Sequence, residues 1–226
     1  METALGATTS KPRPTTRVED AVEILREEIV TGKLPPGSPL RLKALADRLG
    51  MSMMPVRGAL LSLESLGLVE QDPRRGARVG SFSLEDLYDT YEARLALEVL
   101  AVERAASRFT TEDEERARKA LAEHTAAAAN TMASREAHTA LHFAIYEAAR
   151  SPWLIKLIMP LWDNSERYRL VSIPHRGDRE GRRLEHERII DACARRSPRV
   201  AARELSTHLA YTANLVAREL GGEDMF

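Results

Sequence analysis

The chain has 226 residues, with 33 Lys or Arg against 34 Asp or Glu, so its net charge of −1 points to neither a nucleic-acid nor a membrane partner. Its 43% hydrophobic and 30% charged residues exclude wholesale disorder. No apolar run approaches the roughly 20 residues that span a bilayer, and the N-terminus lacks a secretory signal. The single cysteine, Cys193, excludes an internal disulfide. We therefore expect a cytoplasmic protein without a membrane partner.

The first third of the chain predicts a disordered arm and then a small domain of helices and one hairpin. Residues 1–16, rich in Thr, Pro and Ala, predict the arm. Helical periodicity begins at residue 17, a second helix is expected over 42–49 and closed by Gly50, and Ser52 is placed to cap a third. Strand candidates at 68–71 and 77–80 flank a turn at 72–76. Residues 17–81 therefore predict a winged helix-turn-helix domain.

The remainder, residues 82–221, predicts an all-helical bundle. Helices are expected over 84–109, 111–131, 134–150, 152–165, 179–194 and 197–220. The stretch 171–178, with its Pro and Gly, is the main break. The expected fold class is mainly α, a winged helix-turn-helix followed by an all-α bundle.

Four of the six histidines lie where a bundle could bring them together. His138 and His142 are four residues apart on one predicted helix and project from the same face. His186 and His208 lie on the last two helices, and an antiparallel arrangement could place all four at one level. Four imidazoles suit a divalent metal, zinc or nickel. The spacing alone is more often that of a surface or structurally satisfied pair than of a ligand pair.

The other conspicuous residues are expected to be structural. His124 and His175 are expected to face solvent, and Cys193 to be a small buried side chain. The aromatic residues at helical spacing are expected in the core: Phe143, Tyr146, Trp153 and Trp162.

Several ordered motifs resemble a known family. They are Gly-x-Leu-x-Pro-Gly-x-x-Leu at 32–40, Leu-Ala-x-x-Leu-Gly-Met-Ser at 45–52, Pro-Val-Arg-x-Ala-Leu at 55–60, Gly-Leu-Val at 67–69 and Gly-x-x-Val at 76–79. Together they resemble the GntR family of bacterial transcription regulators. The second half, with Tyr-Glu-Ala-Arg-x-x-x-Glu at 91–98, resembles the ligand-binding bundle of its FadR-like branch, the FCD type.

The resemblance implies which residues contact double-stranded DNA. Carried over position by position, they are Lys43, Ser52, Arg57, Arg74, Arg75 and Gly76. Arg57 lies opposite the predicted buried stripe, and an arginine fork can hold O6 and N7 of guanine. Two positions depart from the family, which usually has Arg in place of Met53 and Glu in place of Gly58. A glycine inside a helix costs about 1 kcal/mol relative to alanine.

The resemblance also implies a metal site and an effector site in the bundle. The metal-binding branch of the family places three histidines at His142, His186 and His208, and its usual fourth ligand, an aspartate, is replaced here by His138. The replacement removes a negative charge and favours softer metals. Arg94 is expected either to hold the carboxylate of a small organic acid or to form a structural pair with Glu98.

The leading hypothesis is a homodimeric, ligand-responsive repressor that binds a near-palindromic operator and is not an enzyme. One alternative is a metal-dependent enzyme. Against it, Thr-Ala-Leu separates His138 from His142, so the glutamate of the His-Glu-x-x-His motif is missing. Another alternative is a direct metal sensor, whose DNA affinity depends on the metal itself.

Overall fold

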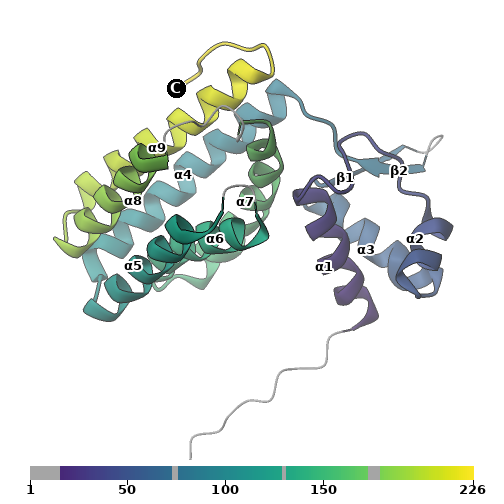
Figure 1. The fold of residues 1–226 in the computed structure, drawn as a ribbon, viewed down its shortest axis with the longest axis horizontal. Helices are drawn as coiled ribbons and strands as arrows, with labels where there is room; N and C mark the ends of the chain where they lie inside the picture. The colour runs from purple at the N-terminus through teal and green to yellow at the C-terminus, as the bar shows by residue number, and fades with distance from the viewer. Residues whose placement is uncertain (1–15, 73–75, 129–130, 173–178) are drawn as a thin grey trace, which may run out of the picture.

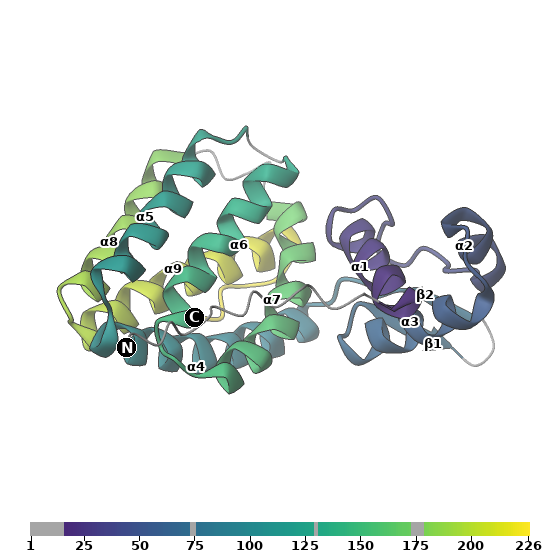
Figure 2. The same ribbon diagram turned by 90° about the horizontal axis from the view of Figure 1, so that it is seen from below.

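The structure is a computed structural model that describes residues 16–72, 76–128, 131–172 and 179–226. Figures 1 and 2 show two bodies side by side, a small N-terminal domain and a larger helical bundle. Most of the expected arm, the wing residues Arg74 and Arg75, and His175 lie outside the described residues.

The N-terminal domain consists of three helices and a hairpin. In chain order they are α1 (Arg17–Val30), α2 (Leu42–Leu49), α3 (Met53–Ser65), β1 (Val69–Asp72) and β2 (Gly76–Val79). A capping box between Thr16 and Glu19 starts α1, and Gly50, at φ +62°, ends α2. The two strands pair antiparallel, with Val69 opposite Val79. This confirms the predicted winged helix-turn-helix.

The glycine inside α3 has a packing reason. A Cβ atom built at Gly58 would lie 3.3 Å from Cγ1 and 3.4 Å from Cγ2 of Val18 on α1. Real Cβ contacts are rarely that short, so a larger residue would require the Val18 side chain to shift by a few tenths of an ångström. The close approach of these two helices accounts for a residue that lowers helix propensity.

The second body is an all-α bundle, as predicted. Its helices are α4 (Leu84–Arg108), α5 (Thr111–Ala126), α6 (Met132–Glu147), α7 (Pro152–Ser172), α8 (Arg179–Ala194) and α9 (Pro198–Glu219). Helix α4 packs along α7 and α9, while α5 packs against α6 and α8. Leu141, Ile145, Ile158 and Leu205 lie in the shared core. Within the described residues, no helix is both long and apolar enough to cross a membrane.

Helix α7 differs from its prediction in two ways. It continues to Ser172 instead of ending near residue 165, because its polar residues over 163–169 are buried and bonded to other elements rather than exposed in a loop. Trp153, expected in the core, is 71% exposed near the start of the helix, so that prediction was wrong. Trp162, more than two turns later, is buried as expected.

Helix α7 also joins the two bodies. Arg26 of α1 donates through Nε to Asp163 Oδ2 at 2.6 Å, and Arg167 Nη1 donates to the carbonyl of Gly80, just after β2, at 2.9 Å. A third link runs from Arg135 of α6 to the carbonyl of Val30 at 3.0 Å. The DNA-binding fold is therefore attached to the bundle through side chains of α6 and α7.

Candidate metal centre and DNA-binding surface

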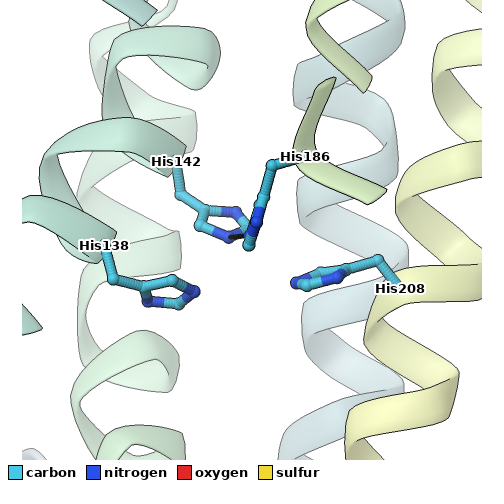
Figure 3. A group of neighbouring side chains, drawn as sticks. All are labelled: His138, His142, His186 and His208. Atoms are coloured by element: carbon cyan, nitrogen blue, oxygen red, sulfur yellow. Dashed lines mark hydrogen bonds between the residues drawn. The ribbon is translucent and has the colours of Figure 1, made fainter. Parts of the chain in front are cut away.

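Four buried histidines converge inside the bundle. His138 and His142 project from α6, His186 from α8 and His208 from α9 (Figure 3). One nitrogen of each ring lies within 4.8 Å of the corresponding nitrogens of the other three. The sequence named these four residues as a set, and the fold brings them together.

The partners of His142 determine which of its nitrogens carries the proton. Its Nδ1 lies 3.0 Å from the Tyr146 hydroxyl, which itself donates to Glu98 Oε2 at 2.6 Å. Burial, reinforced by Glu98, raises the pKa of Tyr146 well above its usual value, so the phenol keeps its proton. Since that proton goes to Glu98, the Tyr146 oxygen must accept from His142 Nδ1–H. The Nε2 lone pair of His142 therefore faces the cluster.

The same reasoning applies to His208. Glu185 Oε2 lies 2.8 Å from His208 Nδ1, and because a carboxylate only accepts, Nδ1 is the protonated nitrogen. Such outer partners orient histidines that ligate metals. His186 differs: its Nε2 faces His142, and within the described residues its buried Nδ1 has no hydrogen-bond partner.

The inner nitrogens of these rings fit a metal ion. His142 Nε2 and His186 Nε2 face each other at 3.2 Å. In the absence of a metal, His186 Nε2–H can donate to the lone pair of His142 Nε2, which leaves Nδ1 of His186 as a buried acceptor without a partner among the described residues. A bound cation would let His186 move its proton to Nδ1, and the 3.2 Å spacing suits such an ion, since zinc–nitrogen bonds of about 2.0–2.1 Å in a tetrahedron separate two ligand atoms by about 3.3 Å. Burial, followed by neighbouring imidazoles, lowers the pKa of both rings well below its usual value. They are thus neutral, which is the form that ligates metals.

His138 has a different environment from the other three histidines. Its Nδ1 lies 2.5 Å from Arg169 Nη1, which also donates to Glu166 Oε1 at 2.6 Å. Its ring stacks on Trp162 with the centroids 5.3 Å apart. Burial and the positive charge of Arg169 lower the pKa of His138 well below its usual value, so this ring is neutral too.

Arg94 forms the structural pair expected for it and also lines a cavity. It is buried and donates to Glu98 through Nε at 2.6 Å and through Nη2 at 3.2 Å, so the structural pair is present. Glu98 raises its pKa against the effect of burial. The guanidinium also lines a small cavity beside the cluster, together with His138, His142, Glu166, Arg169 and His208. Its Nη1 donates to Ser165 of α7 at 2.9 Å.

His124 contradicts its prediction. Instead of facing solvent it is half-buried on α5, and its ring centroid lies 5.2 Å from that of His138. Its Nδ1–H donates to the carbonyl of Ser134 at 2.9 Å. No sequence signal marked this residue, because its position depends on how the last turn of α5 packs against α6 and α8.

The expected DNA-contacting residues lie on the surface of the N-terminal domain. Lys43, Ser52, Arg57 and Gly76 are all exposed, and Arg57 projects from α3 on the side away from buried Val56 and Leu63. Ser52 is the N-cap residue of α3, but its side chain makes no capping hydrogen bond. Met54 is 75% exposed, and it lies next to Met53, the position where the family usually has Arg.

A winged helix-turn-helix joined to a helical bundle with a buried polar cavity defines a DNA-binding transcription regulator that responds to a ligand. Comparison with known families gives the same class. Residues 17–79 match the bacterial regulatory proteins of the gntR family, and residues 89–211 match the FCD domain. The chain belongs to the GntR family and carries an FCD domain. Members of this family are regulators rather than enzymes.

Similar proteins span nearly the whole chain. It is 28% identical over 225 residues to the "Probable D-xylose utilization operon transcriptional repressor" of Paenarthrobacter nicotinovorans, covering 97% of each chain. It is 25% identical to the "HTH-type transcriptional repressor GlaR" of Escherichia coli K12, covering 90% of this chain and 97% of the other. The solved structure of E. coli McbR/YncC has the same fold, with a TM-score of 0.77, 22% identity and coverage of 92% and 100%.

Proposed function

We infer that the protein is a homodimeric repressor that is released from a near-palindromic operator when a small organic acid binds beside a metal in the bundle. Two similar proteins are named as repressors. The observation that carries the sensing part is the convergence of four buried imidazoles. Two of them, His142 and His208, have Nδ1 bonded to a fixed partner. A regulator that binds the chromosome would act in the cytoplasm.

The DNA contacts of this proposal rest on the exposed face of the winged domain. In a dimer, two copies of α3 would enter successive major grooves, with Arg57 at the base edges. Ser52 and Lys43 are exposed near that face and would bond phosphates, and Gly76 would let the wing approach the backbone. Arg74 and Arg75 belong to the same proposal on sequence grounds.

The metal would be held by Nε2 of His142, His186 and His208. The partners of His142 and His208 keep the ring proton on Nδ1, and Nδ1 of His186 has no partner that would prevent the same arrangement within the described residues. When bound, a divalent ion such as zinc or nickel supplies positive charge that attracts a carboxylate. Arg94 lines the same cavity and would pair with that carboxylate. The sequence also assigned His138 as a ligand, a role that requires a lone pair on its inner nitrogen.

The response would pass through α7. Ser165 of this helix bonds Arg94 in the cavity, and Asp163, two residues earlier, bonds Arg26 of the DNA-binding domain. The cavity has a free volume of about 10 Å³, close to that of one water. An acid larger than this would have to displace α7 side chains. It would shift DNA affinity only to the extent that it prefers one arrangement of the two domains.

The test combines elemental analysis with DNA binding by the full chain. We expect about one zinc or nickel per chain and sedimentation as a dimer. Gel shifts on DNA selected from a random pool should show binding that a panel of small carboxylic acids weakens. Absence of metal would contradict the sensing site, and loss of DNA binding on chelation alone would identify a direct metal sensor. Turnover of an acid without DNA binding would favour the enzyme alternative.

A further inference from the structure

The four imidazoles of the cluster differ in the chemistry of their outer partners. His142 faces a phenol oxygen whose proton is committed to Glu98, and His208 faces a carboxylate. Both partners accept hydrogen bonds, so these two rings carry their protons on Nδ1 and present lone pairs at Nε2. Nδ1 of His186 has no hydrogen-bond partner within the described residues, so nothing prevents that nitrogen from holding the proton when Nε2 ligates.

His138 faces a partner of the opposite kind. A guanidinium has only donors, so Arg169 Nη1, at 2.5 Å, must donate to a lone pair on His138 Nδ1. Arg169 is itself fixed by Glu166 at 2.6 Å. A neutral imidazole has a single ring proton, and with Nδ1 accepting, that proton is on Nε2. Figure 3 shows the outermost nitrogen of the His138 ring pointing toward His208, into the cluster.

We propose that His138 is an anion-binding residue and not a metal ligand: its Nε2–H, held by Arg169, donates to an oxygen of the acid that binds beside the metal. The inference rests on the proposed metal site, and it reduces the ligand set to His142, His186 and His208. The fourth coordination position is then open.

The charges around the cavity favour an anion at this position. Three neutral imidazoles would leave the full +2 charge of a divalent ion. Arg94 and Arg169 also line the cavity, and each is paired with a glutamate, Glu98 and Glu166 respectively, so the excess positive charge would come from the ion. A carboxylate with one oxygen toward the metal and the other toward His138 Nε2–H matches this set. The effector class is therefore a small carboxylate, and a cationic or neutral ligand fits poorly.

The first experiment measures Co²⁺ binding to the metal-stripped full chain by its visible spectrum. Glutamine at position 138 can accept from Arg169 through its oxygen and donate inward through its amide, but it is a poor metal ligand. We expect His138→Gln to bind one Co²⁺ per chain with an affinity within about threefold of the wild type. The matched change His142→Gln should weaken binding by about 100-fold or more. Equal weakening in the two variants would overturn the inference and leave the metal site standing.

Acetate serves as the anion probe for the Co²⁺-loaded protein. We expect His138→Leu to keep Co²⁺ but to lose about tenfold or more in acetate affinity, the effect of removing one hydrogen bond to a charged group. His138→Gln should retain acetate binding. Acetate affinity unchanged in His138→Leu would overturn the inference. If the wild type binds no Co²⁺, the proposed metal site itself fails, which is a different result.

The wild-type chain provides a test that needs no substitution. In a ¹⁵N-histidine spectrum of the Zn²⁺-loaded protein, the imidazole that contacts Arg169 and Trp162 should carry its proton on Nε2. The other three cluster rings should carry theirs on Nδ1. Four rings protonated on Nδ1 would mean four ligands and would overturn the inference.

Discussion

Arg26 of α1 and Asp163 of α7 form an ion pair that crosses from the DNA-binding domain to the bundle, with Nε 2.6 Å from Oδ2. The hydrogen bond that Arg26 donates to Asp163 raises the pKa of Arg26, so the pair stays charged. Asp163 is two residues from Ser165, which bonds Arg94 in the cavity. One stretch of helix therefore contacts both the candidate effector site and α1.

Asp163→Asn should weaken the link between cavity and DNA. The variant keeps the side-chain shape but loses the charge that holds Arg26. We expect metal content and basal DNA affinity to stay near wild type. The coupling free energy, which is obtained from the ratio of the DNA affinities with and without an inducing acid, should fall by about 0.5–2 kcal/mol. The measurement is a gel-shift titration at several acid concentrations.

The control for that variant is Glu114→Gln, which removes a half-buried partner of Arg118 within the bundle. This change should leave the coupling intact. Equal coupling in Asp163→Asn and wild type would show that the Arg26–Asp163 pair transmits nothing.

Arg57→Ala should reduce sequence discrimination by the winged domain. Arg57 is exposed on α3, and loss of a bidentate contact to guanine costs about 1–3 kcal/mol at one base pair of each half-site. On an operator altered at that base pair, Arg57→Ala and the wild type should bind with similar affinity. Footprinting on matched operators measures the difference.

Lys43→Ala provides the contrast, because a phosphate contact carries no sequence information. The substitution should lower the affinity for all operators by a similar factor and reduce the salt dependence of DNA binding. If Arg57→Ala also lowered the affinity for all operators by the same factor, that result would contradict a base contact by Arg57.

The winged domain and the histidine set could be predicted because both depend on local patterns. The end of α2 at Gly50 follows from the tolerance of glycine for positive φ. The placement of His138 and His142 on one face of α6 follows from the helical repeat. Burial of Asp163 could not be predicted. A charged side chain is buried only when a partner distant in the sequence is in place, here Arg26. The same limit hid the continuation of α7 and the position of His124.

The roles within the histidine set also lay beyond the sequence. His138 and His142 occupy equivalent positions one turn apart, yet one ring faces Arg169 and the other faces Tyr146. Which nitrogen holds the proton depends on these partners, and Arg169 lies 31 residues from His138 along the chain.

Gly58→Ala should destabilise the winged domain although alanine favours helices. The added Cβ would lie 3.3 Å from Val18 Cγ1, and overpacking of about 1–3 kcal/mol outweighs a propensity gain of about 1 kcal/mol. In a Val18→Ala background the same change should become neutral or stabilising. Urea unfolding of the wild type, the two single variants and the double variant completes this double-mutant cycle. Stabilisation by Gly58→Ala alone would contradict close packing of α1 and α3.

Asp113→Asn should lower the stability of the bundle in a pH-dependent way. Asp113 is fully buried at the start of α5, where it accepts from Thr110 and from Arg116 and Arg150. Burial opposes its charge, but these hydrogen bonds outweigh burial and lower its pKa. Because the folded pKa is below the unfolded one, the stabilisation is complete above the ordinary carboxyl pKa of about 4. It is lost as the pH falls through the lowered value.

At pH 7 we expect Asp113→Asn to lose about 1–2 kcal/mol, since hydrogen bonds to a charged group contribute about 1.5–3 kcal/mol and the two arginines are partly exposed to solvent. The gap to wild type should close toward pH 3. Both tryptophans, Trp153 and Trp162, lie in the bundle, so their fluorescence during urea unfolding follows this part of the chain. Glu112→Gln, an exposed change in the same helical turn, should shift stability by less than about 0.5 kcal/mol. A loss in Asp113→Asn that is the same at pH 7 and pH 3 would show that shape rather than charge sets the contribution of Asp113.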